Sequence, residues 1–398
     1  MKRMLSWILV LTLLLSGCAG NKANEQDGAT DTVPTTAAEP SAENVDIIPE
    51  ETTQAATEAP TEATTAPTEP QVYRNPLNGE ILDAPFTGRV YASTISNMQE
   101  NMPHVGVPHA DVVMEMYVNM NNITRCLALF TDIDSAEAVG STRSTRPIFN
   151  DIAQHYDLVL SHAGGSSTAL NDADNRGIDH FNVDSWEVYE TGASYRDKQY
   201  RRSLENSLFV NGPVFRSYAE AKGVAPELEK DYGFRFTEDG TPAEGEAADT
   251  ISWTMVYKQA KKDTSFVYNA DLDKYVWNQY GEEMHDQITD EPEAFTNVLI
   301  MFANITNNGI YHAADFTAGG TGYYANGGKL IPIVWACDDE DSAFRFMTND
   351  AQDLEMGVGN TYIAIVTPES PVTWEGIEQP ASVQETVAYS ETPAGENG

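Results

Sequence analysis

Short hydrophobic runs alternate with amphipathic stretches along residues 73–236. Some runs have the length and residue types of strands, and other stretches space their apolar residues like one face of a helix. The strand-like runs are 89–97, 110–118, 123–130 and 157–163, of which the second would also fit a helix. The helix-like stretches are 146–156, 167–175 and 212–223. Strands interleaved with helices predict a mixed α/β domain in which helices flank a sheet.

The pattern changes in residues 251–375, where short apolar runs are separated by Asn, Asp and Gly. Many short strands with such turn residues predict a mostly-β domain, either a small barrel or a sandwich. The segment between the two regions, 237–250 (TEDGTPAEGEAADT), contains turn formers and acids and no large apolar residue, which predicts a linker. The predicted fold class is therefore α+β, followed by a mostly-β C-terminal domain.

The first 17 residues have the features of a secretory signal peptide. Lys2 and Arg3 precede an apolar run that is too short to span a bilayer as a finished helix. The run ends in Leu-Ser-Gly-Cys, which resembles the bacterial lipoprotein signal, in which the cysteine is lipidated. We expect Cys18 to anchor the protein at the outer face of the cytoplasmic membrane. The alternative is an ordinary signal peptide with a chance cysteine.

The segments on either side of the predicted domains have a composition that does not form a core. Residues 18–72 consist mainly of Thr, Ala, Glu and Pro and contain no aromatic residue, and 376–398 is acidic. Such chains bury too little apolar surface to offset the entropy of ordering. We expect a disordered tether that holds the folded part away from the membrane, and a disordered tail.

Charge and motif content exclude several classes of protein. The chain has 61 acidic residues against 23 Lys and Arg, a formal net charge of −38, so general nucleic-acid binding is excluded. The remaining cysteines, Cys126 and Cys337, lie in apolar runs and predict buried free thiols. Without a CxxC, HExxH, Walker or GxSxG motif, the sequence predicts no metal ion and no cofactor.

The stretch 139–167 (VGSTRSTRPIFNDIAQHYDLVLSHAGGSS) holds the main candidate site. Arg143 and Arg146 lie three residues apart, and His162 ends a predicted strand before Gly164, Gly165 and Ser166. A glycine-rich turn at the start of a helix presents backbone N–H groups to an anion, and guanidinium groups bind phosphate or carboxylate in pairs of hydrogen bonds. The sequence therefore predicts an anion-binding pocket, to which Arg176, Arg201 and Arg202 would add charge. In the alternative interpretation, a serine caps the helix, the glycines form a turn and the arginines pair with acids.

A second group, Asp111, Glu115 and Arg125, is predicted to support this pocket. On a strand, residues 111 and 115 lie on the same face, and Arg125 on the next run would neutralise them. A metal site or a general acid–base pair is one alternative, and a buried ion-pair network is the other.

Several motifs carry a family resemblance. They are NPLNGE (75–80), VPHADVVMEM (107–116), ITRCLALF (123–130), VGSTRSTRP (139–147), YDLVLSHAGGS (156–166) and GGTGYYANGGKLIPIVWA (319–336). In this order they resemble the YerB-like lipoproteins, a two-domain family. The resemblance implies a two-domain fold and a lipid anchor but no reaction. The family pattern has Pro-His-Asn where this chain has Glu205-Asn206-Ser207, so no role of that histidine is carried over.

Two functions follow as hypotheses. The first is a lipoprotein without enzymatic activity that binds an anionic envelope ligand or a protein partner. The second is an envelope enzyme that acts on a phosphorylated or carboxylated glycan or lipid-linked substrate through Arg143, Arg146 and His162. Arginines that face open solvent beside His162 would favour the second.

Overall fold

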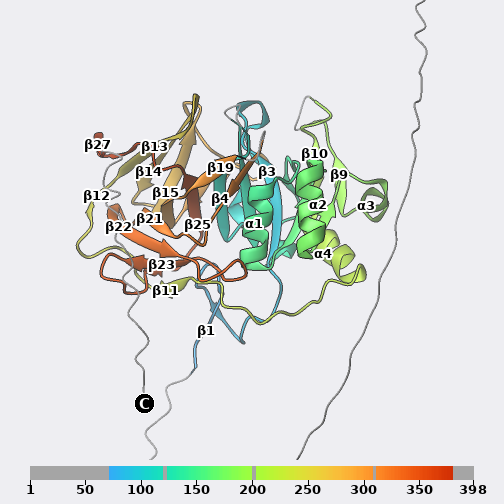
Figure 1. Ribbon diagram of the computed structural model, residues 1–398, viewed down its shortest axis with the longest axis horizontal. Helices are drawn as coiled ribbons and strands as arrows, with labels where there is room; N and C mark the ends of the chain where they lie inside the picture. Colours follow the sequence, from blue (N-terminus) through green and yellow to red (C-terminus); the bar gives the residue numbers. More distant parts are fainter. Residues whose placement is uncertain (1–70, 120–122, 200–202, 308–310, 380–398) are drawn as a thin grey trace, which may run out of the picture. The chain divides into compact units, whose positions relative to one another are not determined.

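The computed structural model describes residues 71–379 apart from 120–122, 200–202 and 308–310 (Figure 1). The predicted signal peptide, Cys18 and most of the predicted tether and tail lie outside these residues. The helices are α1 (Pro147–Tyr156), α2 (Ser167–Arg176), α3 (Trp186–Thr191) and α4 (Gly212–Ala221), with single 3-10 turns at Gln99–Asn101, Val107–His109 and Ile133–Ser135. The three predicted helices are confirmed, and α3 is additional. No helix in the described part of the chain has the length and apolar character needed to span a bilayer.

A large mixed sheet forms the centre of the fold. Its strands follow the order β12-β22-β21-β18-β25-β4-β5-β3-β7-β8, and β23 pairs with β22. Their bounds are β12 (Glu246–Ala247), β22 (Lys329–Ala336), β21 (Gly320–Asn326), β18 (Asn297–Phe302), β25 (Thr361–Val366), β4 (Val112–Tyr117), β5 (Thr124–Phe130), β3 (Tyr91–Ser96), β7 (Val159–His162), β8 (His180–Asn182) and β23 (Arg345–Thr348). The strands β25 and β4 pair in parallel, with Thr361 opposite Val112, so one sheet joins the regions before and after the predicted linker.

A second sheet is antiparallel throughout and belongs to the C-terminal region. It runs β16-β15-β14-β13-β26-β27, with β17 beside β15. The bounds are β16 (Glu282–Glu283), β15 (Lys274–Gln279), β14 (Ala260–Asn269), β13 (Thr250–Tyr257), β26 (Val372–Trp374), β27 (Ile377–Gln379) and β17 (Ala294–Phe295). The predicted fold class, α+β with a sheet flanked by helices and followed by a mostly-β region, is confirmed: the N-terminal region has a mixed sheet with few helices and the C-terminal region is mostly antiparallel.

Aromatic side chains pack the two sheets against each other. Tyr362 of β25 lies 4.8 Å from the ring of Phe266 and 5.0 Å from that of Trp277, both on the second sheet. Large aromatic rings dominate the energy of such cores because each buries a large apolar area.

Both faces of the central sheet are covered, which explains its long apolar runs. Along β4, Met114 belongs to the same core as Ile152 of α1, and Val113 belongs to the opposite core together with Phe215 of α4. Successive side chains of a strand point to opposite faces, so a strand covered on both sides carries apolar residues throughout. Cys126 and Cys337 are free and buried, as predicted.

Four short sheets complete the fold. They are β6 (Val139–Gly140), β10 (Leu208–Val210) and β9 (Ser194–Arg196); β19 (Ile305–Asn307) and β20 (His312–Ala314); β1 (Tyr73–Arg74) and β2 (Ile81–Leu82); and β11 (Arg235–Thr237) and β24 (Glu355–Gly357). In Figure 1, α1 and α2 lie side by side.

Candidate functional site

The segment that carries Arg143 and Arg146 runs between the end of β3 and the glycine loop. The backbone N–H of Arg143 donates to the carbonyl of Thr94 at 2.9 Å, and that of Ala163 donates to the carbonyl of Arg143 at 2.9 Å. The N–H of Thr145 donates to the carbonyl of Gly164 at 3.0 Å. The two halves of the predicted site are therefore held side by side by main-chain hydrogen bonds.

Each half leads into a helix. Arg146 is the N-cap residue of α1, and Ser166 caps α2 by accepting a hydrogen bond from the N–H of Ala169 at 3.1 Å. Gly164 has a φ of +64°, a conformation that glycine adopts without strain. The serine thus serves as a helix cap, as in the alternative interpretation, but the amino ends of two helices still add partial positive charge next to the arginines.

Arg125 is the most buried of the arginines at this site. Its side chain lies at the start of β5, only 5% of its surface is exposed, and it donates to the carbonyl of Ser144. Burial, and after it repulsion by the guanidinium groups of Arg146 and Arg143, lowers the pKa of Arg125 well below its usual value. No carboxylate in the described part of the chain forms an ion pair with it.

Arg146 and Arg143 differ in their partners. The guanidinium of Arg146 lies 4.7 Å from the ring centre of Tyr311 and donates to the carbonyl of Thr145 at 2.6 Å, while its buried Nε has no hydrogen-bond partner. Arg143 donates to the Glu205 carboxylate at 2.6 Å, to the Glu205 carbonyl at 3.2 Å and to the Asn206 side chain at 3.0 Å. Among the described residues, Glu205 is therefore the only carboxylate that forms an ion pair with any of these three arginines, and its partner is Arg143.

His162 is enclosed behind the glycine loop. Its Nδ1 donates to the carbonyl of Gly164 at 2.8 Å, so its Nε2 accepts a hydrogen bond from Nδ1 of His180 at 2.9 Å. The Nε2 of His180 lies 3.1 Å from Asp174. Burial, and after it the charge of His180, lowers the pKa of His162 to about 4. Both nitrogens of this imidazole are occupied, so it holds the loop and is not free to contact a ligand.

This environment predicts a pH-dependent loss of stability. The depressed pKa means that the unfolded chain takes up a proton at His162 between about pH 6.5 and 4 while the folded chain does not, so stability falls as the pH falls through this window. The contribution is roughly 3 kcal/mol. Urea unfolding at pH 7 and pH 4.5 measures the free energy of unfolding at each pH. We expect the difference between the two values to be smaller in His162→Gln than in the wild type. His285→Gln, at a partly exposed histidine paired with Glu283, is the control, and an unchanged slope in His162→Gln would contradict the prediction.

The two predicted supporting carboxylates make their hydrogen bonds away from the arginines. Asp111 accepts from the side chain of Asn78 at 2.6 Å and from the backbone and hydroxyl of Thr131. Glu115 is fully buried and pairs with Lys262 of β14 at 2.7 Å. Among the described residues, no arginine bonds to either carboxylate, and of the predicted supporting group only Arg125 interacts with Arg143 and Arg146.

Three further arginines were predicted to add positive charge to the pocket. Arg176 is engaged by Asp151 at 3.0 Å and Asp172 at 2.9 Å, and Arg201 and Arg202 lie outside the described residues. Within the part of the chain that the structure describes, no group of three His, Cys, Asp or Glu side chains is placed to hold a metal ion. Among the described residues, the charge available for an anion at this site is therefore that of Arg125, Arg143 and Arg146.

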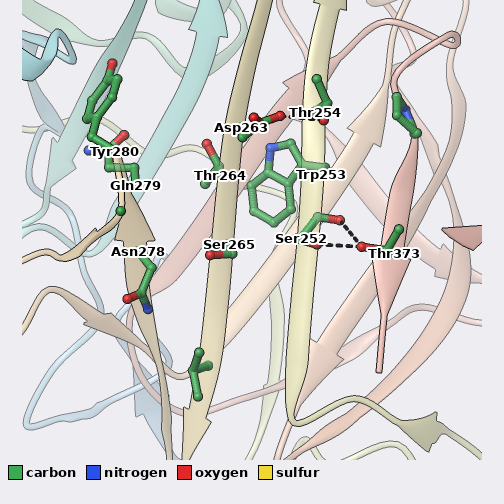
Figure 2. Close-up of a pocket in the computed structure, with 13 residues that line it drawn as sticks. Ser252, Trp253, Thr254, Asp263, Thr264, Ser265, Asn278, Gln279, Tyr280 and Thr373 are labelled. Carbon is green, nitrogen blue, oxygen red and sulfur yellow. Dashed lines mark hydrogen bonds between the residues drawn. The ribbon is translucent and has the colours of Figure 1, made fainter. Parts of the chain in front are cut away.

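A separate hollow of about 710 Å³ lies on the second sheet (Figure 2). Its polar lining consists of Ser252, Thr254, Asp263, Thr264, Ser265, Asn278, Gln279, Tyr280 and Thr373. The hydroxyl of Thr254 donates to Asp263 at 2.6 Å, and Ser252 bonds to Thr373 at 2.5 Å. Because no lysine or arginine is among its described lining residues, this hollow does not suit an anion.

Two adjoining sheets, one mixed and one antiparallel, define an α+β protein with a cluster of arginines beside a helix start. Two family models match the chain: the N-terminal domain of "Protein of unknown function (DUF3048)" over residues 77–225, and the C-terminal domain of the same family over residues 253–363. The chain belongs to this two-domain family. The matched ranges lie on either side of segment 237–250.

The relatives agree with this assignment. The chain is 25% identical over 248 residues to YerB of Bacillus subtilis (strain 168), a protein provisionally named a lipoprotein, over 61% of this chain and 71% of YerB. The crystal structure of YerB from Bacillus subtilis superposes with a TM-score of 0.64 at 21% identity, covering 75% of this chain and 99% of that one. The predicted family resemblance is confirmed, and the superposition shows a shared fold.

Proposed function

We propose that this protein is an extracytoplasmic lipoprotein, held by a lipid on Cys18 at the outer face of the cytoplasmic membrane, that binds an anionic envelope ligand with Arg125, Arg143 and Arg146. The signal-like segment ending in Cys18 and the naming of the YerB relative support the anchor. The long stretch of Thr, Ala, Glu and Pro after Cys18 would give the folded part reach from the membrane.

The observation that supports binding is the imbalance of charge at the site. The chain has 61 acidic residues, yet the three guanidinium groups share only the exposed carboxylate of Glu205. Placing a buried cation such as Arg125 next to two others costs free energy unless a negative charge compensates it. A bound anion would supply that charge and would accept the hydrogen bonds that these arginines do not make within the described chain.

The geometry favours binding over the enzymatic alternative. His162, the general acid–base candidate, is buried and has both ring nitrogens engaged. Its low pKa, caused first by burial, keeps the imidazole neutral at pH 7. No specific contact therefore gives this histidine a role in a reaction at the arginines.

Thermal melting of the full chain in phosphate and in chloride of equal ionic strength tests the proposal. A ligand that binds only the folded state stabilises it by about 2.7 kcal/mol at a hundred times its Kd. We expect phosphate to raise the Tm progressively with concentration. Equal melting in the two salts would refute an anion site.

Cys18→Ala tests the anchor. Without the thiol no lipid can be attached, so we expect the variant to leave the membrane fraction or to accumulate as an unprocessed precursor. Fractionation and labelling with a radioactive fatty acid measure both outcomes. A variant that is still processed and lipid-labelled would contradict the assignment.

A further inference from the structure

Glu205 lies on a turn whose backbone is fixed while its side chain is free. The carbonyl of Asn206 accepts a hydrogen bond from the hydroxyl of Ser141 at 2.6 Å, and Arg196 donates to the carbonyl of Leu204. The side chain of Glu205, in contrast, is 76% exposed. Its carboxylate can therefore leave Arg143 by rotating about its own side-chain bonds, without any movement of the turn.

The carboxylate of Glu205 occupies a position that suits the acidic group of a ligand. One oxygen lies 2.6 Å from a terminal nitrogen of Arg143, whose side chain is only 13% exposed. Burial and the neighbouring guanidinium groups lower the pKa of Arg125, and the charge of Glu205 opposes that effect. Glu205 thus interacts electrostatically with two of the three arginines at once.

The charges at the site indicate the class of ligand. Three guanidinium groups and one carboxylate meet here among the described side chains, so a ligand that displaces Glu205 faces three positive charges. A phosphate monoester carries about −1.5 to −2 at pH 7 and offers three acceptor oxygens, whereas a carboxylate carries one charge and two oxygens. Guanidinium groups bind phosphate oxygens through paired hydrogen bonds. The phosphate group supplies more compensating charge than a carboxylate does, and it offers one acceptor oxygen for each of the three guanidinium groups.

We infer that the site takes a dianionic phosphate group as its ligand and that Glu205 competes with that group for Arg143. This inference rests on the proposed anion-binding function and adds both the ligand class and an internal competitor. The exposed carboxylate lowers the affinity of the site for phosphate and shields Arg143 when no ligand is bound.

Calorimetric titration of the full chain in neutral detergent tests the competition. Removing the competitor in Glu205→Gln should tighten phosphate binding about fivefold, the upper range for an exposed ion pair. Glu238→Gln is the matched control, because Glu238 is a 73% exposed glutamate that pairs with Arg74 at 2.7 Å. It removes the same charge and should change the affinity less than twofold.

The ligand class is tested by varying the probe. Acetate, with a single charge, should bind at least tenfold more weakly than inorganic phosphate. Glycerol 3-phosphate and vesicles that contain phosphatidic acid distinguish a small soluble phosphate ester from a lipid headgroup. The probe that binds more tightly than inorganic phosphate identifies the source, and either result agrees with the inference.

The outcomes separate the two proposals. A wild-type chain that binds none of the phosphate probes would refute the anion-binding function itself. A wild-type chain that binds phosphate, with Glu205→Gln no tighter than Glu238→Gln or weaker than wild type, would refute only the role of Glu205 as a competitor. Acetate binding as tight as phosphate binding would refute the dianion.

Discussion

Replacing Arg143 and Arg146 together by alanine should abolish measurable phosphate binding and leave the protein folded. Each charge-assisted hydrogen bond to an anion contributes about 1.5–3 kcal/mol, so losing two arginines weakens binding by about a hundredfold or more. The fold should survive because Arg143 pairs with an exposed glutamate and Arg146 has no carboxylate partner in the described chain. Calorimetric titration and urea unfolding measure the two effects.

The control for this variant removes the same charge elsewhere. Arg235 and Arg345 are both partly exposed and pair with Asp231 and Asp353. Replacing these two by alanine should change phosphate affinity only slightly, because surface charges at a distance are screened by salt. If both double variants weaken phosphate binding equally, the effect is one of net charge and not of a site.

Replacing Glu115 by alanine should cause the largest loss of stability, about 3–5 kcal/mol, because it leaves the ammonium of Lys262 buried without its counter-charge. The Glu115 carboxylate is fully buried and also accepts hydrogen bonds from Asn97, Thr124 and Tyr362. Burial raises the pKa of Glu115, but Lys262 and the hydrogen bonds outweigh it, so this pKa lies below its usual value. Urea unfolding at pH 7 measures the loss.

A double variant shows whether the pair itself is needed. In Glu115→Met with Lys262→Met, no unpaired charge remains, and replacing a buried ion pair by apolar groups is often close to neutral. We expect the double variant to be more stable than Glu115→Ala. A double variant that is less stable than the single one would mean that the surrounding hydrogen bonds, and not the charge, govern the stability.

The local pattern of the sequence was sufficient to predict most of the secondary structure. The fully buried β4 reads as an apolar run interrupted only by Glu115, because the core that contains α1 covers one face and the second sheet covers the other. The helices α1, α2 and α4 carry clear starting residues. The proximity of the arginine segment and the glycine loop was also predictable. The two segments are close in the sequence, and they precede the successive helices α1 and α2. The short α3 was missed because it has only six residues and its Trp186 is 76% exposed.

Partners that are distant in the chain could not be predicted in the same way. Lys262 lies on a strand of the second sheet, and nothing in the local pattern of β14 links it to Glu115. Tyr311 directly precedes β20, and Glu205 lies on a turn. Both contact the arginines only because the tertiary fold brings these distant segments together. Such pairings depend on strand order across the sheets, which hydrophobic periodicity does not encode.

The most direct test of the arginine site is a crystal structure of the protein grown or soaked in sulfate, a tetrahedral dianion. We expect an ordered sulfate ion within hydrogen-bond distance of the guanidinium groups of Arg125 and Arg146, with Arg143 turned toward it from Glu205. Ordered sulfate ions at other surfaces, with none at these arginines and Arg143 still paired with Glu205, would show that the arginines do not form an anion site.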